Sequence, residues 1–142
     1  MSARIIAFDL DDVLCWRDHD EASKEKYKFC KPIPEMISLV NMCYDQGHNI
    51  IIYTARGMSI YAKDKIKIYN ELFSLTKNHL DEWGIKYHQL VMGKYPYDLL
   101  IDDKAVSSFD IKSFDDIKNA LKRSKQKRNE SRSHHIRSST KI

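Results

Sequence analysis

Short runs of branched apolar residues recur along the chain, and each run stops abruptly at polar residues. Such runs are typical of strands that are buried within a parallel sheet. The predicted strands are residues 4–8, 49–53, 88–92 and 98–101. Their apolar composition leaves little room for the alternation that marks a strand with one face in water.

Segments with the spacing of amphipathic helices lie between these strands. Apolar residues at helical intervals predict helices over residues 34–46 and 59–83, each followed directly by a glycine that suits a helix end. Ser113 and Asp116 form the pattern of a capping box, which predicts the start of a third helix. Strands that alternate with helices predict an α/β fold, with a mainly parallel sheet flanked by helices. A polar segment over residues 14–31 interrupts the alternation and is predicted to be a short insertion, either a loop or a hairpin.

Charge is distributed unevenly between the body of the chain and its end. Residues 122–142 hold eight Lys and Arg residues against one acid, Glu130, so this tail has a formal charge of +7 and residues 1–121 have −3. The tail is rich in serine and has few large apolar residues, so it cannot bury enough surface to fold alone. We therefore predict one domain over residues 1–121 and a disordered basic tail. The alternative is a tail that binds a polyanion, either nucleic acid or an anionic membrane face.

Composition excludes several broad classes. Hydrophobic residues make up 42% of the 142 residues, which excludes a wholly disordered chain. The mean hydropathy is −0.56, and no apolar run approaches the roughly 18 residues of a transmembrane segment. The N-terminus lacks the apolar core and cleavage site of a signal peptide. The three cysteines form no CxxC pair, which favours reduced thiols in a cytoplasmic protein over a disulfide framework or a zinc site.

Candidate catalytic, binding or metal-ligating residues follow each predicted strand. In chain order they are Asp9 and Asp11; Thr54, Ala55 and Arg56; Lys94; and Asp102 and Asp103. Because the carboxyl ends of parallel strands meet at one edge of a sheet, we expect these side chains to converge. A cluster of acids is costly unless a cation offsets the repulsion, and hard oxygen donors suit Mg²⁺.

These four groups, in this order, resemble the sequence motifs of the haloacid dehalogenase superfamily of phosphotransferases. The motif residues are Asp9 to Val13 for the first group, Thr54 for the second, Lys94 for the third, and Asp102 with Asp103 for the fourth. The resemblance covers residues 4 to about 110 and implies a Rossmann-like core. Residues 53–57 and 101–105 are similar to short phosphatases of capsule polysaccharide biosynthesis, which lack a full cap domain. One departure is Asp12, where many relatives have glycine, and it bears on the turn after Asp11.

The resemblance implies a mechanism with an aspartyl-phosphate intermediate and bound Mg²⁺. Asp9 would be the nucleophile, and Asp11 would protonate the leaving group and then activate water. Thr54 and Lys94 would bind the transferred phosphoryl group and stabilise its charge. The metal ligands would be Asp9, Asp11 through its backbone carbonyl, Asp102 and Asp103.

Two of these residues have an open alternative. Arg56, with Ala55, follows Thr54 at a place where a guanidinium would bind a second anionic group of the substrate. The alternative is that Arg56 pairs with an acid of the domain. Asp103 would bind the metal directly or through water, or would instead pair with Lys104.

The predicted function is Mg²⁺-dependent hydrolysis of a phosphomonoester, with a phosphorylated sugar or capsule precursor as substrate. Between Val13 and Pro34, and between Thr54 and Lys94, the chain has no room for a full cap, so we expect an open site that a second copy of the chain could cover in a homo-oligomer. One alternative, motivated by the basic tail, is a phosphatase of nucleotides or nucleic-acid ends. The other is a phosphate-binding scaffold without catalysis.

Overall fold

The protein forms two compact units. The computed structural model describes residues 2–17 and 24–139. The first unit comprises residues 1–97, and the second comprises residues 98–142. Residues 18–23 of the predicted insertion and the last three residues of the tail lie outside the described residues.

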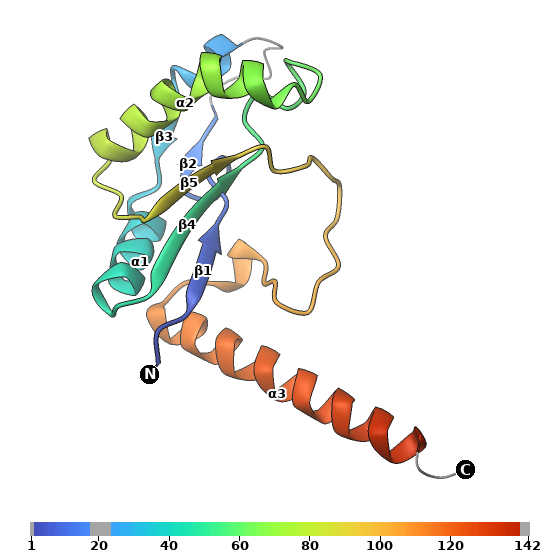
Figure 1. Ribbon diagram of the computed structural model, residues 1–142. Helices are drawn as coiled ribbons and strands as arrows, with labels where there is room; N and C mark the ends of the chain where they lie inside the picture. Colours follow the sequence, from blue (N-terminus) through green and yellow to red (C-terminus); the bar gives the residue numbers. More distant parts are fainter. Residues whose placement is uncertain (1, 18–23, 140–142) are drawn as a thin grey trace. The chain divides into compact units, whose positions relative to one another are not determined.

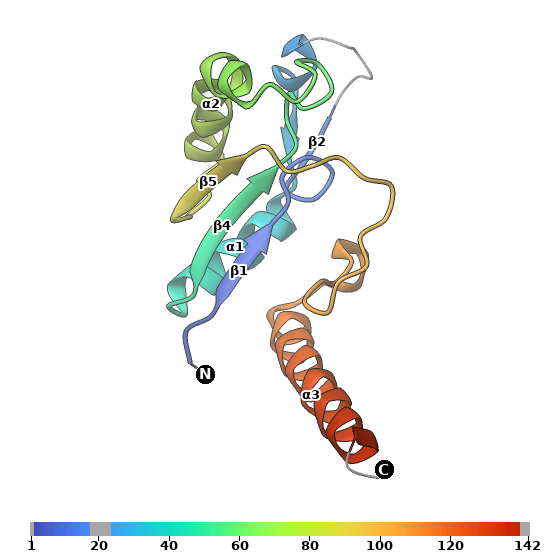
Figure 2. The same ribbon diagram turned by 45° about the vertical axis from the view of Figure 1, so that its right-hand side comes forward.

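A three-stranded parallel sheet organises the first unit. Strands β1 (Ile5–Phe8), β4 (Asn49–Thr54) and β5 (Gln89–Met92) lie in the order β1-β4-β5. Both ladders are parallel, and the arrowheads of all three strands point the same way in both views (Figure 1; Figure 2). The α/β class and three of the predicted strands are therefore confirmed, each within one residue of its predicted bounds.

The two helices of this unit connect the three strands. Helix α1 (Pro34–Asp45) links β1 to β4, and helix α2 (Lys65–Glu82) links β4 to β5. Since both connections move across the sheet in the same direction, right-handed crossovers place both helices on the same face. Pro34 lies in the first turn of α1, where a missing N–H costs nothing.

Helix α2 begins later than the sequence predicted. The apolar pattern predicts a start at Ser59, whereas the helix begins at Lys65. Ala62 and Lys63 have positive φ angles of 50° and 64°, which a right-handed helix excludes. The side chain of Asp64 then caps the helix by accepting a hydrogen bond from the backbone N–H of Lys67 at 3.2 Å.

The core lies on the face of the sheet that carries the helices. Ile50, Ile52 and Thr54 alternate along β4 and are buried, whereas Tyr53, which points to the other face, is 38% exposed. Leu72 and Leu80 of α2 are also fully buried. Within the described residues, the central strand is therefore packed more closely on one face than on the other, although its composition suggested burial on both.

The predicted insertion is built on a small antiparallel ladder. Strands β2 (Cys15–Trp16) and β3 (Lys31–Pro32) pair, and a short 3-10 helix, η1 (Lys24–Tyr27), precedes β3. Of the two alternatives, loop or hairpin, the paired ends of the segment favour the hairpin.

In the second unit, the predicted strand over residues 98–101 is wrong. These residues form no strand, and the side chains of Leu99 and Ile101 are 76% and 90% exposed. Branched apolar residues favour extended backbone. A strand, however, also needs a neighbouring strand with which to form hydrogen bonds. None of the described strands pairs with this segment. A 3-10 helix, η2 (Ser108–Asp110), follows instead.

Helix α3 (Phe114–Ser139) completes the second unit. The capping box is confirmed, because Asp116 N–H donates to Ser113 Oγ at 3.2 Å and Ser113 N–H donates to Asp116 Oδ2 at 3.0 Å. The structure continues this helix through a region that the sequence predicted to be disordered from residue 122. Lys, Arg, Gln and Glu have high helix propensity, and Gln126 bonds Glu130 one turn away at 3.0 Å. No described helix has both the length and the apolar character to cross a membrane.

Candidate functional site

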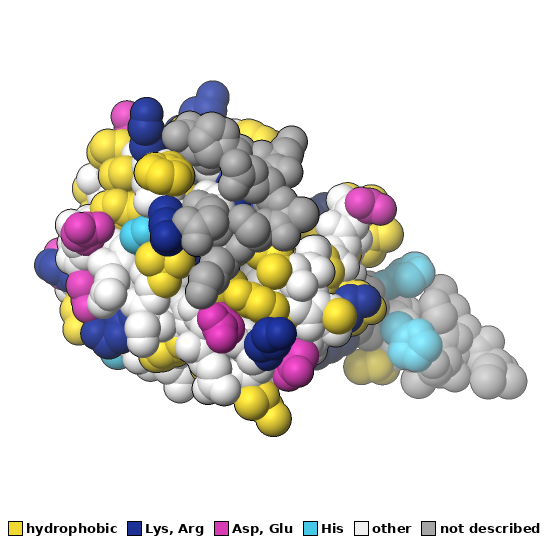
Figure 3. All heavy atoms as spheres, turned by 90° about the horizontal axis from the view of Figure 1, so that it is seen from above, with side chains coloured by type: hydrophobic (Ala, Val, Ile, Leu, Met, Phe, Trp, Pro, Cys, Tyr) yellow, Lys and Arg dark blue, Asp and Glu magenta, His cyan; other side chains and the backbone are white. Residues whose placement is uncertain are grey.

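A cavity of about 300 Å³ lies at the carboxyl ends of the sheet strands. It is lined by six of the predicted site residues, namely Asp9, Asp11, Thr54, Ala55, Arg56 and Lys94. Viewed from above, the direction in which the strands point, the surface shows basic and acidic side chains close to each other (Figure 3). The expected convergence of the first three strand ends is therefore present.

Asp9 and Lys94 form an ion pair in this cavity. Lys94 Nζ lies 3.3 Å from Asp9 Oδ2, and Asp9 Oδ1 accepts a hydrogen bond from Leu10 N–H at 2.9 Å. Burial raises the pKa of Asp9, and the charge of Lys94 opposes this rise. For Lys94 the balance is reversed: burial acts to lower its pKa, but Asp9 and Tyr97 outweigh burial, so the pKa is raised. Lys94 therefore keeps its positive charge at neutral pH.

The end of β4 positions both Thr54 and Lys94. The backbone N–H of Lys94 donates to the carbonyl of Thr54 at 3.0 Å, which places Lys94 beside the strand end. Thr54 is 1% exposed, and its Oγ1 accepts a hydrogen bond from the N–H of Arg56 at 3.1 Å. Since the hydroxyl accepts in that bond, its own proton remains available to a ligand oxygen in the cavity.

Asp11 is held by Arg56 rather than by Lys94. Arg56 is 1% exposed, and its Nε and Nη2 lie 3.0 Å from Asp11 Oδ2 and Oδ1 respectively. Burial acts to lower the pKa of Arg56, but Asp11 outweighs it and the pKa is raised. The result is a buried bidentate ion pair that fixes the Asp11 carboxylate.

The remaining contacts of Arg56 are also within the protein. Its Nη1 donates to Thr76 Oγ1 at 3.3 Å and to His79 Nδ1 at 3.0 Å, and the Tyr27 ring lies 4.9 Å from its guanidinium carbon. With all three nitrogens engaged, the structure favours the alternative in which Arg56 pairs with an acid of the domain. Arg56 then acts as a structural cation that orients Asp11.

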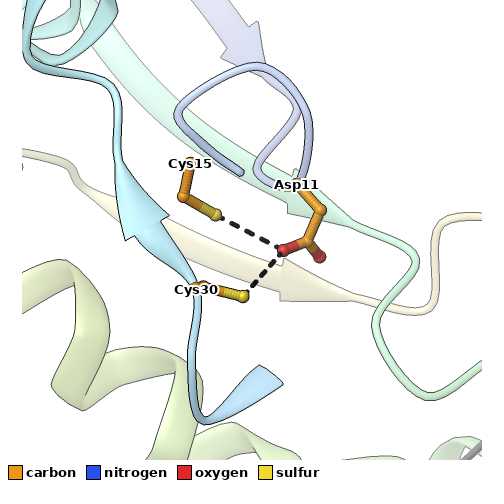
Figure 4. Close-up of side chains that lie close together, drawn as sticks. All are labelled: Asp11, Cys15 and Cys30. Carbon is orange, nitrogen blue, oxygen red and sulfur yellow. Dashed lines mark hydrogen bonds between the residues drawn. The ribbon is translucent and has the colours of Figure 1, made fainter. Parts of the chain in front are cut away.

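Two thiols lie against the same carboxylate. Cys15 Sγ and Cys30 Sγ lie 3.4 Å and 3.8 Å from Asp11 Oδ1 (Figure 4). The three potential ligand atoms are within 4.8 Å of one another, which is compatible with a metal site. However, Arg56 Nη2 lies 3.7 Å and 3.6 Å from the two sulfurs, so a buried cation already occupies this position. Contact with Cys30 and burial raise the pKa of the Cys15 thiol.

The partners of Asp11 were missed by sequence reasoning. Cys30, which contacts Asp11, and His79, which contacts its partner Arg56, carry no motif that connects them to this site. Cys15 alone had a signal, since it follows Asp11 by four residues on a chain that returns to the sheet edge. Asp12 lies at the turn between them with a φ angle of 67°, a left-handed conformation that suits glycine and that aspartate tolerates.

Asp102 and Asp103 belong to the second unit. Asp102 Oδ1 accepts from Lys104 N–H at 3.0 Å, and this backbone bond, with a bond from Asp103, lowers the pKa of Asp102. Asp103 pairs with Arg128, whose Nε lies 3.6 Å from its Oδ2, rather than with Lys104 as the alternative held. Their convergence with Asp9 stays a prediction.

Comparisons with known proteins bear on the fold. No protein-family model matches the chain, and no curated protein matches it significantly. A crystal structure of an MCSG target from Vibrio cholerae is similar, with a TM-score of 0.69 and 25% sequence identity over 84% of this chain and 98% of that one. The chain therefore shares its architecture with a solved bacterial protein.

Replacement of Arg56 by alanine should destabilise the protein by about 3–5 kcal/mol, because it leaves the Asp11 carboxylate inside the protein without its partner. Arg17→Ala is the matched control. It removes an ion pair with Asp12 at 2.9 Å in which the two side chains are 37% and 50% exposed, and it should cost about 0–1 kcal/mol. Urea unfolding of both variants measures the difference. Equal losses would contradict the role assigned to Arg56.

His79 should make the protein less stable in mild acid. Its Nδ1 accepts from Arg56, so the ring is neutral, and burial together with the Arg56 charge lowers its pKa from 6.5. The lowered pKa contributes stability above pH 6.5 that is lost as the pH falls further. His79→Asn keeps an acceptor and removes the titration, so its free energy of unfolding should fall less between pH 7 and about pH 5. His48, whose pKa burial also lowers, is common to both proteins. Parallel stability curves would contradict the prediction.

Proposed function

We propose that the protein is a Mg²⁺-dependent phosphomonoester hydrolase with a haloacid dehalogenase-like core, acting through an aspartyl-phosphate intermediate. The observation that carries this proposal is the convergence of Asp9, Lys94 and Thr54 on one cavity, with Lys94 Nζ 3.3 Å from Asp9. A carboxylate, a fixed ammonium and a hydroxyl donor are the groups that phosphoryl transfer requires.

Asp9 supplies the nucleophile. Its carboxylate oxygen attacks phosphorus, the bond from phosphorus to the ester oxygen breaks, and the phosphoryl group is left on Asp9. Lys94 and the Thr54 hydroxyl stabilise the charge that spreads over the phosphoryl oxygens. Water then attacks phosphorus, the bond to Asp9 breaks, and inorganic phosphate leaves.

Asp11 moves the proton. It enters the first step as the carboxylic acid and gives its proton to the leaving alkoxide, and as the carboxylate it takes a proton from the attacking water in the second step. Its carboxylate lines the cavity and its side chain is 14% exposed, but Arg56 and the two thiols hold it. The proposal therefore requires the Asp11 side chain to separate from Arg56, take up a proton and turn toward the leaving oxygen before the first step.

The residues of the cavity fit Mg²⁺ in part. Asp9 offers a carboxylate in the cavity, and the backbone carbonyl of Asp11 is the second donor that the resemblance assigns. The resemblance assigns the rest of the oxygen set to Asp102 and Asp103 of the second unit, and carboxylate oxygen is the donor chemistry that Mg²⁺ prefers. When bound, the ion screens the repulsion between the nucleophile and the phosphate ester.

The rim of the cavity favours a substrate with a large leaving group. Tyr95 and Tyr97 line the cavity and are 61% and 47% exposed, and Arg17 and Lys26 line it as well. Between Val13 and Pro34, the described residues form a short ladder and a 3-10 helix and supply no full cap domain for this edge. A phosphorylated sugar or capsule precursor fits exposed aromatic faces beside cationic groups.

The test is hydrolysis of an aryl phosphate by the purified chain. We expect turnover with Mg²⁺, loss of turnover with a chelator, and a fall of Asp9→Asn to background, because an amide is not a nucleophile here. Asp11→Asn should lower the rate by about 10²–10⁴-fold. Asp45→Asn is the control, since it removes a carboxylate that pairs with Lys86 on the surface. Phosphate binding without turnover by the wild type would favour the scaffold alternative instead.

Helix α3 supports a second candidate, a phosphatase of nucleic-acid ends. Lys118, Lys122, Lys125 and Arg132 recur at intervals of three, four and seven residues, so they share one face of the helix. Replacing Lys122, Lys125 and Arg132 together by glutamine should slow hydrolysis of a 5′-phosphorylated oligonucleotide and leave the aryl phosphate rate unchanged. The salt dependence of oligonucleotide binding should also become shallower, by about 2 in the slope of log K against log salt. Equal effects on both substrates would contradict this candidate.

A further inference from the structure

Two cysteines from separate segments share one carboxylate oxygen, and the proposed mechanism uses neither. Cys15 lies in β2, and Cys30 precedes β3 directly. Both thiols point toward Asp11 Oδ1, and their sulfurs are within 4.8 Å of each other (Figure 4). We propose that Cys15 and Cys30 form a reversible disulfide, with a peroxide as oxidant, and that this bond lowers the activity of the Asp11 site. The effect on activity rests on the proposed function, whereas formation of the bond does not.

The small ladder brings the two cysteines to one face. Cys15 pairs with Pro32, and Cys30 lies two residues before Pro32, so the cysteines are diagonal neighbours across β2 and β3. A disulfide requires a sulfur–sulfur distance of about 2.05 Å, so the sulfurs must approach each other. The ladder contains two residue pairs, which makes this approach a local movement of a short segment.

Cys30 is the thiol of the pair that a small oxidant can reach. Asp11, which contacts both thiols, lines the cavity, and Cys30 is 9% exposed whereas Cys15 is fully buried. Cys30 therefore reacts first: its sulfur attacks the peroxide, the O–O bond breaks, and a sulfenic acid and one water form. The Cys15 thiol then attacks that sulfur and displaces the second water. Two thiols are oxidised by two electrons, and one hydrogen peroxide is reduced to water.

Formation of the disulfide would displace the backbone on either side of Asp11. The carbonyl of Cys15 accepts from Asp12 N–H at 2.7 Å, and the N–H of Cys15 donates to the carbonyl of Leu10 at 3.3 Å. A displacement of Cys15 toward Cys30 thus moves the residues on both sides of Asp11. Both S–H donors to Asp11 are lost at the same time. Misplacement of a catalytic group by about 1 Å can cost about 10²-fold in rate.

The experiment treats the reduced full-length chain with hydrogen peroxide, blocks the remaining thiols with an alkylating agent, and measures the mass. We expect one alkylated cysteine instead of three, and a peptide map that joins Cys15 to Cys30 within one chain. Dithiothreitol should restore all three. Cys43→Ser, which removes the third buried thiol on α1, is the matched control and should still form the bond. Cys30→Ser should not form it.

Activity on an aryl phosphate is measured in parallel. We expect oxidation to lower the rate about ten-fold or more in the wild type and in Cys43→Ser, and dithiothreitol to restore it. Three alkylated cysteines after peroxide, or a bond to Cys43 or between chains, would overturn the proposal. A fully active disulfide form would overturn the regulatory part. If the reduced protein has no phosphatase activity but still forms the disulfide after peroxide, the proposed function is contradicted and the disulfide proposal is supported.

Discussion

The buried ion pair between Arg56 and Asp11 connects the separate parts of the first unit. Arg56 follows the central strand, Asp11 follows the first strand, and the same guanidinium reaches Thr76 and His79 on α2. A charge that is 1% exposed is costly unless it is paired and fully hydrogen-bonded. The loop after β1, the loop after β4 and the C-terminal half of α2 are therefore constrained together. Any conformation that separates them leaves a charge or a polar group inside the protein without its partner.

This constraint gives two neighbouring carboxylates different environments. Asp9 and Asp11 are two residues apart, yet Asp9 pairs with Lys94 and Asp11 pairs with the buried Arg56. Lys94 lines the cavity, where a phosphate oxygen can share its ammonium with Asp9. The arginine has a planar fork whose nitrogens are all engaged, so it holds a position instead of binding a ligand. The turn at Asp12, with φ at 67°, allows this divergence over so few residues.

The sequence predicts those features that depend on neighbours along the chain. The strands at β1, β4 and β5, the first-turn proline of α1 and the capping box at Ser113 were all predicted from local patterns, and the parallel topology then placed Thr54 and Lys94 beside Asp9. What it could not give were features that depend on a distant partner. Residues 98–101 have the composition of a strand but no ladder, and Asp11 is joined to Arg56 across 45 positions and to Cys30 across 19. No sequence periodicity marks these pairs, because their members come together around one buried charge, that of Arg56, and not through neighbours along the chain.

The charges around the cavity argue for an added cation in the proposed reaction. Each acid that lines it has its own cationic partner, with Asp9 on Lys94, Asp11 on Arg56 and Asp12 on Arg17. A phosphate ester that enters meets Lys26 as the lining cation that pairs with none of these three acids, and binding the ester through Lys94 removes the counter-ion of Asp9. Two anions would then face each other at bonding distance, which is unfavourable in a partly buried site. In the proposed reaction, a positive charge that enters with the substrate would offset this repulsion, and that is the chemistry the proposed Mg²⁺ would supply.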